Sequence, residues 1–391
     1  MPKQSEVAAQ GTQEQTTHEE PASGSLLGRI AVEVGTIFSL AWPQTVNGVT
    51  SFLPRLLMLV AVGHLDNGAV YIGAAGIGSM YANFAHIMLI RSSGYGAMGL
   101  FSQAFGAANH ARVGLILMRV LVMHAILLCL VALPLTAAAA PLLATFGLPS
   151  AVSSFAQTFV WTRLLGLPGI IIFSDLQVYL NAQRCVRLPM VISICSASVQ
   201  MALLFVLTRS LGFVGAPLAM TIAELLQGAA MLVATPWLLR RHKLRSWPSW
   251  RRDARKALHG WHEVLAKGGP GAVLIMAEWL GWECTIAVAS GLCPPDGDAC
   301  APVEAIPICT QVFVLQFIIA FGAPLAMCIR IGNLLGEGRP AEACFCARVA
   351  WVMALYAPSG SDPPVHTRAA SERRALESLV RTAPSKQWPH R

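Results

Sequence analysis

Long apolar stretches separated by short polar connections dominate this chain. Eight of them approach or exceed the roughly 20 apolar residues that a helix needs to cross the hydrocarbon core of a bilayer. A bilayer interior offers no partners for unpaired backbone groups, and the stretches lack the alternation of about 10 residues that is typical of barrel strands. The pattern therefore predicts an all-α, polytopic membrane bundle with spans at 34–62, 70–98, 113–136, 151–178, 188–208, 213–239, 265–291 and 305–330.

Composition strengthens this prediction and suggests an orientation. The 391 residues are 55% hydrophobic and only 12% charged, whereas an ordinary soluble domain carries about 25% charged residues. Lys and Arg lie before the first span and after the even-numbered spans, while only Arg209 follows an odd-numbered one. Because positive loops stay on the cytoplasmic side, we expect a cytoplasmic amino terminus. The net charge of +8 is explained by this orientation, so we expect no nucleic-acid partner, and the sequence leaves open a plasma or a vacuolar membrane.

An internal repeat is indicated by three landmarks that recur at an offset of about 230 residues. Trp42-Pro43 is echoed by Gly269-Pro270, Gly63-His64-Leu65 by Gly291-Leu292, and the run from Gln103 by the run from Asn333. We therefore expect a complete six-helix unit followed by part of a second one, because the apolar stretch that ends at Tyr356 is too short to span. The predicted organisation is a disordered cytoplasmic tail at 1–30, an amino-terminal lobe at 31–240, a basic linker at 241–262, a partial carboxyl-terminal lobe at 263–356 and a disordered polar tail at 357–391.

Four sequence runs resemble one transporter family. They are F-S-Q-A-F-G-A-A from Phe101, L-Q-V-Y-L-N-A-Q from Leu176, E-W-L-G-W-E from Glu278 and R-I-G-N-L-L-G-E-G from Arg330. In this order and spacing they look like the signatures of eukaryotic multidrug and toxic compound extrusion (MATE) transporters. The resemblance implies two six-helix lobes around a central cavity, and export of organic cations or other amphiphiles against an inward flow of protons or sodium. Met98 stands where family members often carry Asp.

Glu278 and Glu283 are the sharpest candidates for proton and substrate binding. A carboxylate at membrane depth is costly unless it faces a cavity or a partner, and desolvation favours its protonated form. Proton and cation can then compete for one group. Five residues separate the two carboxylates by about 140° around a regular helix, so a shared face requires helix distortion, which the Gly268–Gly271 run around Pro270 favours. Trp279 and Trp282 offer π faces to an organic cation, or pack against lipid.

Further polar and special residues form a second tier. Glu304 lies two residues after the position where the family's eighth-helix carboxylate aligns, Glu224 is a reserve proton site, and Gln44 and Asn47 could line the cavity. Arg55 and Arg91 match no motif, and either could reach an interface or pair with a carboxylate. The remaining candidates are structural or gating residues: Pro43 and Pro270 as helix kinks, Gln103 and Asn333 in helix capping or lobe packing, and Gly106 and Gly336 as helix terminators.

Function at this stage has two competing interpretations. The first is a proton-coupled antiporter that exports organic cations, drugs or metabolites, working as a monomer in the bilayer with a small amphiphilic substrate and no cofactor besides the coupling ion. The second is a truncated membrane fragment that does not transport. We find no nucleophile elbow, phosphate loop or metal motif, so the sequence does not support enzyme chemistry.

Overall fold

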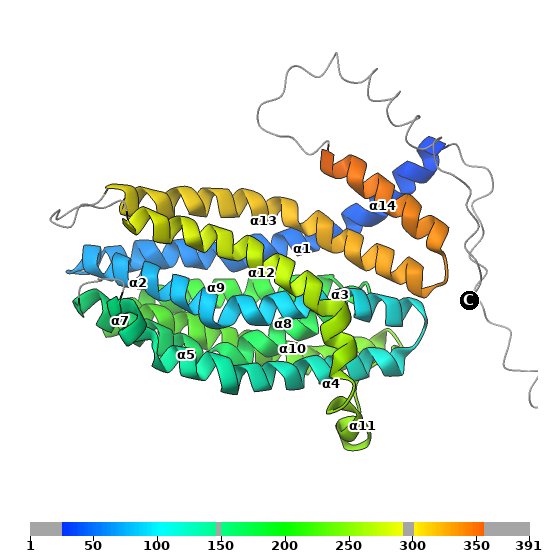
Figure 1. Cartoon of the computed structure of the whole chain (residues 1–391), viewed down its shortest axis with the longest axis horizontal. Coiled ribbons are helices and arrows are strands. Elements are labelled where there is room, and N and C mark those ends of the chain that lie inside the picture. The colour runs from blue at the N-terminus through cyan, green and yellow to red at the C-terminus, as the bar shows by residue number, and fades with distance from the viewer. Residues whose placement is uncertain (1–25, 146–149, 292–300, 356–391) are drawn as a thin grey trace, which may run out of the picture.

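The computed structural model describes residues 26–145, 150–291 and 301–355, and over these ranges the chain is a bundle of long helices that run side by side (Figure 1). Every predicted span coincides with a helical stretch. The predicted tails at 1–25 and 356–391 lie outside the described residues. The helices are α1 Leu26–Gly63, α2 Gly68–Ala82, α3 Met88–Gly106, α4 His110–Leu127, α5 Leu133–Ala137, α6 Ala139–Thr145, α7 Ser150–Leu164, α8 Leu167–Ala182, α9 Arg187–Leu211, α10 Gly215–Arg241, α11 Trp250–Ala257, α12 Trp261–Gly291, α13 Ala301–Gly336 and α14 Pro340–Leu355.

Several spans are irregular in ways the hydrophobic pattern did not reveal. The π-helical segments η1 Asn83–Ile87 and η2 Leu128–Ala132 interrupt the second and third spans. The fourth span is a pair of helices bent by 51° between Leu164 and Leu167. Pro168 lies in the first turn of α8, where its missing N–H costs nothing, so the chain can change direction there.

Length and hydropathy alone select four described stretches as able to cross a membrane, or five if the bent pair counts as one span. One of them, Arg187–Arg241, contains both α9 and α10, which the short 3-10 segment η3 Gly212–Val214 joins. The two helices form a hairpin that turns at Gly212, where φ is 62°. This left-handed conformation favours glycine. Leu130, Val233 and Leu274 expose more than two thirds of their surface, as expected of side chains solvated by lipid.

The helices of the predicted second repeat pack against those of the first. α13 lies along α1, and α12 lies along α3 (Figure 1). Glycines allow the close approach: a Cβ at Gly322 of α13 would lie 2.8 Å from the Ala41 carbonyl of α1, and one at Gly268 of α12 would lie 3.1 Å from the Gly96 carbonyl of α3. The buried apolar core continues from α3, α4 and α8 into α13 and α14. The contact between the two predicted repeats is therefore a packed interface, and the candidate site lies within it.

Candidate functional site

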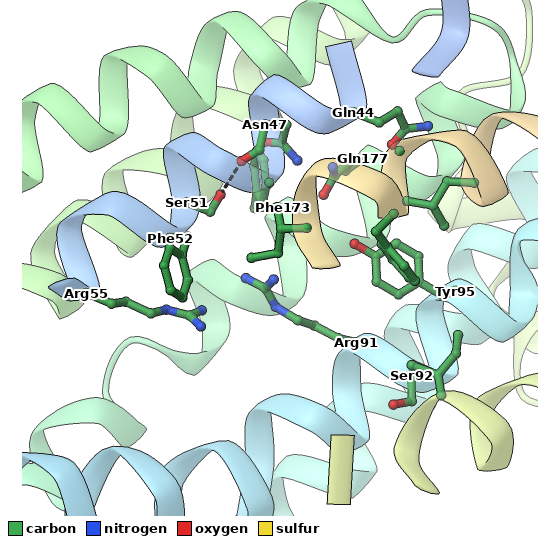
Figure 2. Close-up of a pocket in the computed structure, with 16 residues that line it drawn as sticks. Gln44, Asn47, Ser51, Phe52, Arg55, Arg91, Ser92, Tyr95, Phe173 and Gln177 are labelled. Atoms are coloured by element: carbon green, nitrogen blue, oxygen red, sulfur yellow. Dashed lines mark hydrogen bonds between the residues drawn. The ribbon is translucent and has the colours of Figure 1, made fainter. Parts of the chain in front are cut away.

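A cavity of about 80 Å³ lies between the two predicted repeats, enclosed by α1, α3, α8, α12 and α13 (Figure 2). That volume holds roughly three water molecules, since each occupies about 30 Å³ in the liquid. Its apolar wall is largely aromatic, and Tyr95 of α3 meets Phe321 of α13 edge-to-face with ring centroids 6.0 Å apart. The cavity thus joins side chains from both ends of the sequence, and its described lining combines aromatic, polar and cationic groups: Phe52, Tyr95, Phe173, Phe321, Gln44, Asn47, Ser51, Ser92, Gln177, Arg55 and Arg91.

Hydrogen bonds hold the amide wall of the cavity in place. Asn181 of α8 donates to the Gln44 Oε1 atom at 2.9 Å. Ser193 of α9 donates to Asn47 Oδ1, and Gln227 of α10 donates to the same serine oxygen at 3.0 Å. Gln44 Nε2 is buried without a partner among the described residues. The structure therefore places Gln44 and Asn47 on the cavity, at the centre of a polar network that connects four helices.

Two arginines extend into the cavity, Arg55 from α1 and Arg91 from α3 (Figure 2). Arg91 Nε and the neighbouring Ser92 Oγ are buried, and neither atom has a hydrogen-bond partner among the described residues. The described part of the lining contains no Asp or Glu. Both cationic groups of the described lining therefore come from helices of the amino-terminal part of the chain.

The predicted carboxylates lie apart from this described lining. Glu278 is an exposed residue of α12, one turn beyond Ile275, which lines the cavity. Glu283, Trp279 and Trp282 also belong to α12, and Glu304 belongs to the first turn of α13, but their side chains lie outside what the structure describes. Pro270 lies inside α12 and Pro43 lies buried inside α1, and both helices continue through their prolines.

Glu224, the reserve candidate, is bound by Arg163. The guanidinium of α7 makes two hydrogen bonds to the carboxylate of α10, at 2.5 and 2.7 Å. Only 3% of the arginine side chain and 16% of the glutamate side chain are exposed. This bidentate geometry is typical of strong charge-assisted pairs and holds the two helices together.

A second buried polar cluster was missed by the sequence reasoning. His124 of α4 contacts Asp175 of α8 through Nδ1 and Oδ2 at 2.8 Å, and its Nε2 lies 2.6 Å from Ser93 Oγ of α3. Both members of the His–Asp pair have side chains that are 0% exposed, and Asp175 Oδ1 has no described partner. The available signal was a histidine and an aspartate in otherwise apolar spans, since each such group needs a partner.

The four landmark residues of the repeat meet at one end of the bundle. Gly106 ends α3 and Gly336 ends α13, and each approaches the other helix so closely that a Cβ would lie 2.1 Å from the Asn333 carbonyl and 2.2 Å from the Gln103 carbonyl. In the orientation that satisfies its amide, Asn333 donates to the Ser102 carbonyl at 2.9 Å and accepts from Arg184 Nε at 3.1 Å. These residues thus lie in the contact between the repeats. The Gln103 side chain is exposed.

Comparisons with known proteins agree with this architecture. A model of the MatE family matches residues 43–206. Protein DETOXIFICATION 51 of Arabidopsis thaliana is 25% identical over 88% of this chain and 63% of its own length, and Multidrug and toxin extrusion protein 2 of Oryctolagus cuniculus is 28% identical over 80% and 50%. The crystal structure of the eukaryotic MATE transporter AtDTX14 superposes with a TM-score of 0.73 and 20% identity, covering 83% of this chain and 70% of that one. The chain thus spans between half and about two thirds of these curated relatives.

Proposed function

We propose that this chain is a secondary active transporter of the multidrug and toxic compound extrusion (MATE) family, and that it exports amphiphilic organic molecules in exchange for protons. The single observation that carries this proposal is the cavity between α1, α3 and α8 on one side and α12 and α13 on the other. A site at a repeat interface, at the depth of the apolar spans, is where alternating access can expose a substrate to either side.

Proton coupling is assigned to Glu278 and Glu283 on α12. Protonated carboxyls are stable in an apolar environment, whereas ionised ones require water or a cation. A carboxyl near the cavity therefore releases its proton when the surroundings become hydrated, and binds one again when they close. The predicted preference for organic cations rests on these two carboxylates, because the described lining of the cavity supplies no negative charge.

We also propose an orientation of the chain in the membrane and its division into two lobes. The basic stretch around α11 belongs on the cytoplasmic side, together with the amino terminus. The amino-terminal lobe contains α1 to α10, and α12 to α14 form the described part of the second lobe. A protease-accessible tag after Arg391 tests the orientation, since we expect protection of that tag in intact cells and cleavage after permeabilisation.

Flux measured in proteoliposomes tests the function. We expect an imposed pH gradient to drive uptake of an aromatic amphiphile by the reconstituted chain, a protonophore to abolish this uptake, and Glu278→Gln to abolish it as well. Gln316→Glu, at an exposed position of α13, is a control for changes of charge on a neighbouring helix. Protein that inserts and remains monodisperse but shows no gradient-driven flux favours the alternative of a non-transporting membrane polypeptide.

A further inference from the structure

The buried His124–Asp175 pair takes no part in the proton coupling assigned to α12. Both side chains are fully buried, and Nδ1 of the imidazole lies 2.8 Å from Oδ2 of the carboxylate. The other carboxylate oxygen, Oδ1, is buried without a hydrogen-bond partner among the described residues, and a Cβ added at Gly94 of α3 would lie 3.5 Å from it. With a neutral imidazole the pair contains one unbalanced negative charge inside an apolar bundle, which is unfavourable. One bound proton removes that charge.

Ser93 of α3 allows the imidazole to be hydrogen-bonded in either charge state. The Ser93 Oγ atom lies 2.6 Å from His124 Nε2 and 3.0 Å from the Ile90 carbonyl oxygen. A hydroxyl can both donate and accept, so it donates to Nε2 of a neutral imidazole. When a proton binds at Nε2, the imidazolium donates to Oγ, and the hydroxyl hydrogen turns to the Ile90 carbonyl. Proton uptake at Nε2 therefore leaves no hydrogen-bonding atom of the imidazole unsatisfied.

Other charges around the pair are accounted for by their own partners or by exposure. Within two helical turns of the three side chains, the described charged or titratable groups are His86, Arg91, Tyr95, Arg119, Cys129 and Tyr179. The helices packed against α4 and α8 add groups that pair elsewhere: Glu224 with Arg163, Asp253 with Lys256, Glu263 with Arg112 and Arg119, and Arg330 with Glu33. Glu278 of α12 is exposed. Among the described residues, Asp175 is thus the carboxylate that compensates His124, and no third metal-binding side chain joins the two.

The helices that hold the pair also form a wall of the cavity. Phe173 and Gln177 of α8 line the cavity (Figure 2), and Asp175 lies between them in sequence. Because two residues on a helix are about 200° apart, Asp175 lies on the opposite face of α8 from its two cavity-lining neighbours. On α3, Ser93 likewise follows Ser92, which lines the cavity. A fully buried proton exchanges with water only when the packed helices α3, α4 and α8 separate, and such a separation moves the cavity wall.

We propose that His124 and Asp175 form a second proton-binding site, in the amino-terminal lobe, whose loading and release accompany movement of the cavity wall. The proton is held at His124 Nε2 against Ser93 Oγ, and the Asp175 carboxylate balances its charge. This inference rests on the proposed function only where it identifies the bound proton as one that the transport cycle exchanges. The site and the carboxylates of α12 can therefore be tested separately.

The first experiment measures proton binding directly, by ¹⁵N NMR of labelled histidine in the whole chain in phosphatidylcholine nanodiscs. Near neutral pH we expect an imidazolium signal that is absent in His124→Gln and present in His64→Gln, the matched control at an exposed histidine. In Asp175→Asn the His124 signal should titrate at a pH lower by about one unit or more, because an adjacent opposite charge changes proton affinity about tenfold or more. Glu278→Gln should leave this titration unchanged.

The second experiment measures uptake of an aromatic amphiphile driven by a pH gradient in proteoliposomes. We expect Asp175→Asn to lose most of this uptake and His64→Gln to retain it. Wild-type uptake by Asp175→Asn overturns the proposal. A His124 ring that is neutral near neutral pH, or one that titrates alike in wild type and Asp175→Asn, also overturns it.

A variant with a smaller structural effect keeps the proposal testable if Asp175→Asn fails to fold. Ser93→Ala removes the acceptor of the imidazolium Nε2 proton, so His124 should then titrate at a lower pH. An unchanged titration in Ser93→Ala overturns the proposal. Because titration at equilibrium needs no transport, a shifted titration together with a wild type that shows no gradient-driven flux refutes the proposed function and leaves the proton site standing.

Discussion

Replacing both members of the Arg163–Glu224 pair should destabilise the protein far less than replacing either one. Glu224→Met leaves Arg163 as a lone charge with a side chain only 3% exposed, and the loss of one partner of such a pair costs about 3–5 kcal/mol. Arg163→Met leaves Glu224, which is 16% exposed and gains some hydration, so we expect about 2–4 kcal/mol. The double variant substitutes two apolar side chains of similar length and should lie within about 1 kcal/mol of wild type. The resulting coupling energy is at least about 4 kcal/mol.

The assay is equilibrium unfolding in mixed micelles by titration with sodium dodecyl sulfate, followed by tryptophan fluorescence, on all four proteins. The transition must be cooperative and reversible for the cycle to be valid. The hydrogen bond from Thr221 to the Thr162 carbonyl at 2.7 Å, which links the same two helices beside the pair, is unchanged in every variant. Additive losses, with the double variant as unstable as the sum of the singles, would refute the view that this pair is a structural clamp.

The remaining predictions concern three other features. Gly106→Ala should lower the free energy of unfolding by about 1–3 kcal/mol, because the added Cβ would lie 2.1 Å from the Asn333 carbonyl. The control Gly99→Ala should be neutral, since a Cβ there would have nothing within 4 Å. Equal melting temperatures of the two variants would contradict the close packing. His124→Ala should destabilise the folded protein by about 3 kcal/mol or more, because it leaves Asp175 buried without its partner. If this is the cause, adding Asp175→Ala should recover part of the stability in the same unfolding assay. Burial of Glu263 raises its pKa, but Arg112, Lys267 and Arg119 outweigh burial and lower the pKa below the ordinary value of 4.5. The ionised Glu263 therefore stabilises the contact between α12 and α4 fully above about pH 4.5, and this stabilisation is lost as the pH falls through the lowered pKa. The melting temperature should fall as the pH is lowered through this range in wild type and should fall less in Glu263→Gln.

Secondary structure was largely predictable because each span must satisfy its own backbone within the bilayer, which makes apolar length a strong signal. The irregularities were not predictable to the same degree. The bend before Leu167 has a local cause in Pro168, but nothing in the apolar pattern marks the π-helical segments around His86 and Leu128. Gln44 and Asn47 could be placed on the cavity because polar side chains next to a proline stand out in an apolar helix.

Partners distant in sequence could not be derived from the pattern. Arg163 and Asp175 are too far apart to pair on one helix face, and the structure pairs each with a residue from another helix, Glu224 and His124. Periodicity shows that such charges need partners and does not identify them. The convergence of Arg55 and Arg91 on one cavity is equally a tertiary property, because the two residues come from helices whose neighbours are set by the fold of the whole bundle.

Gly106 and Gly336, where the ends of α3 and α13 cross, hold one end of the bundle more tightly than the other. Two backbones in direct contact leave no side chains to be compressed or separated, so this crossing can act as a fulcrum. α13 has 36 residues, and a helix of that length forms a lever of about 54 Å. A tilt of only about 10° at the fulcrum would displace the opposite tip by roughly 9 Å, enough to admit a small molecule while the crossing itself hardly moves.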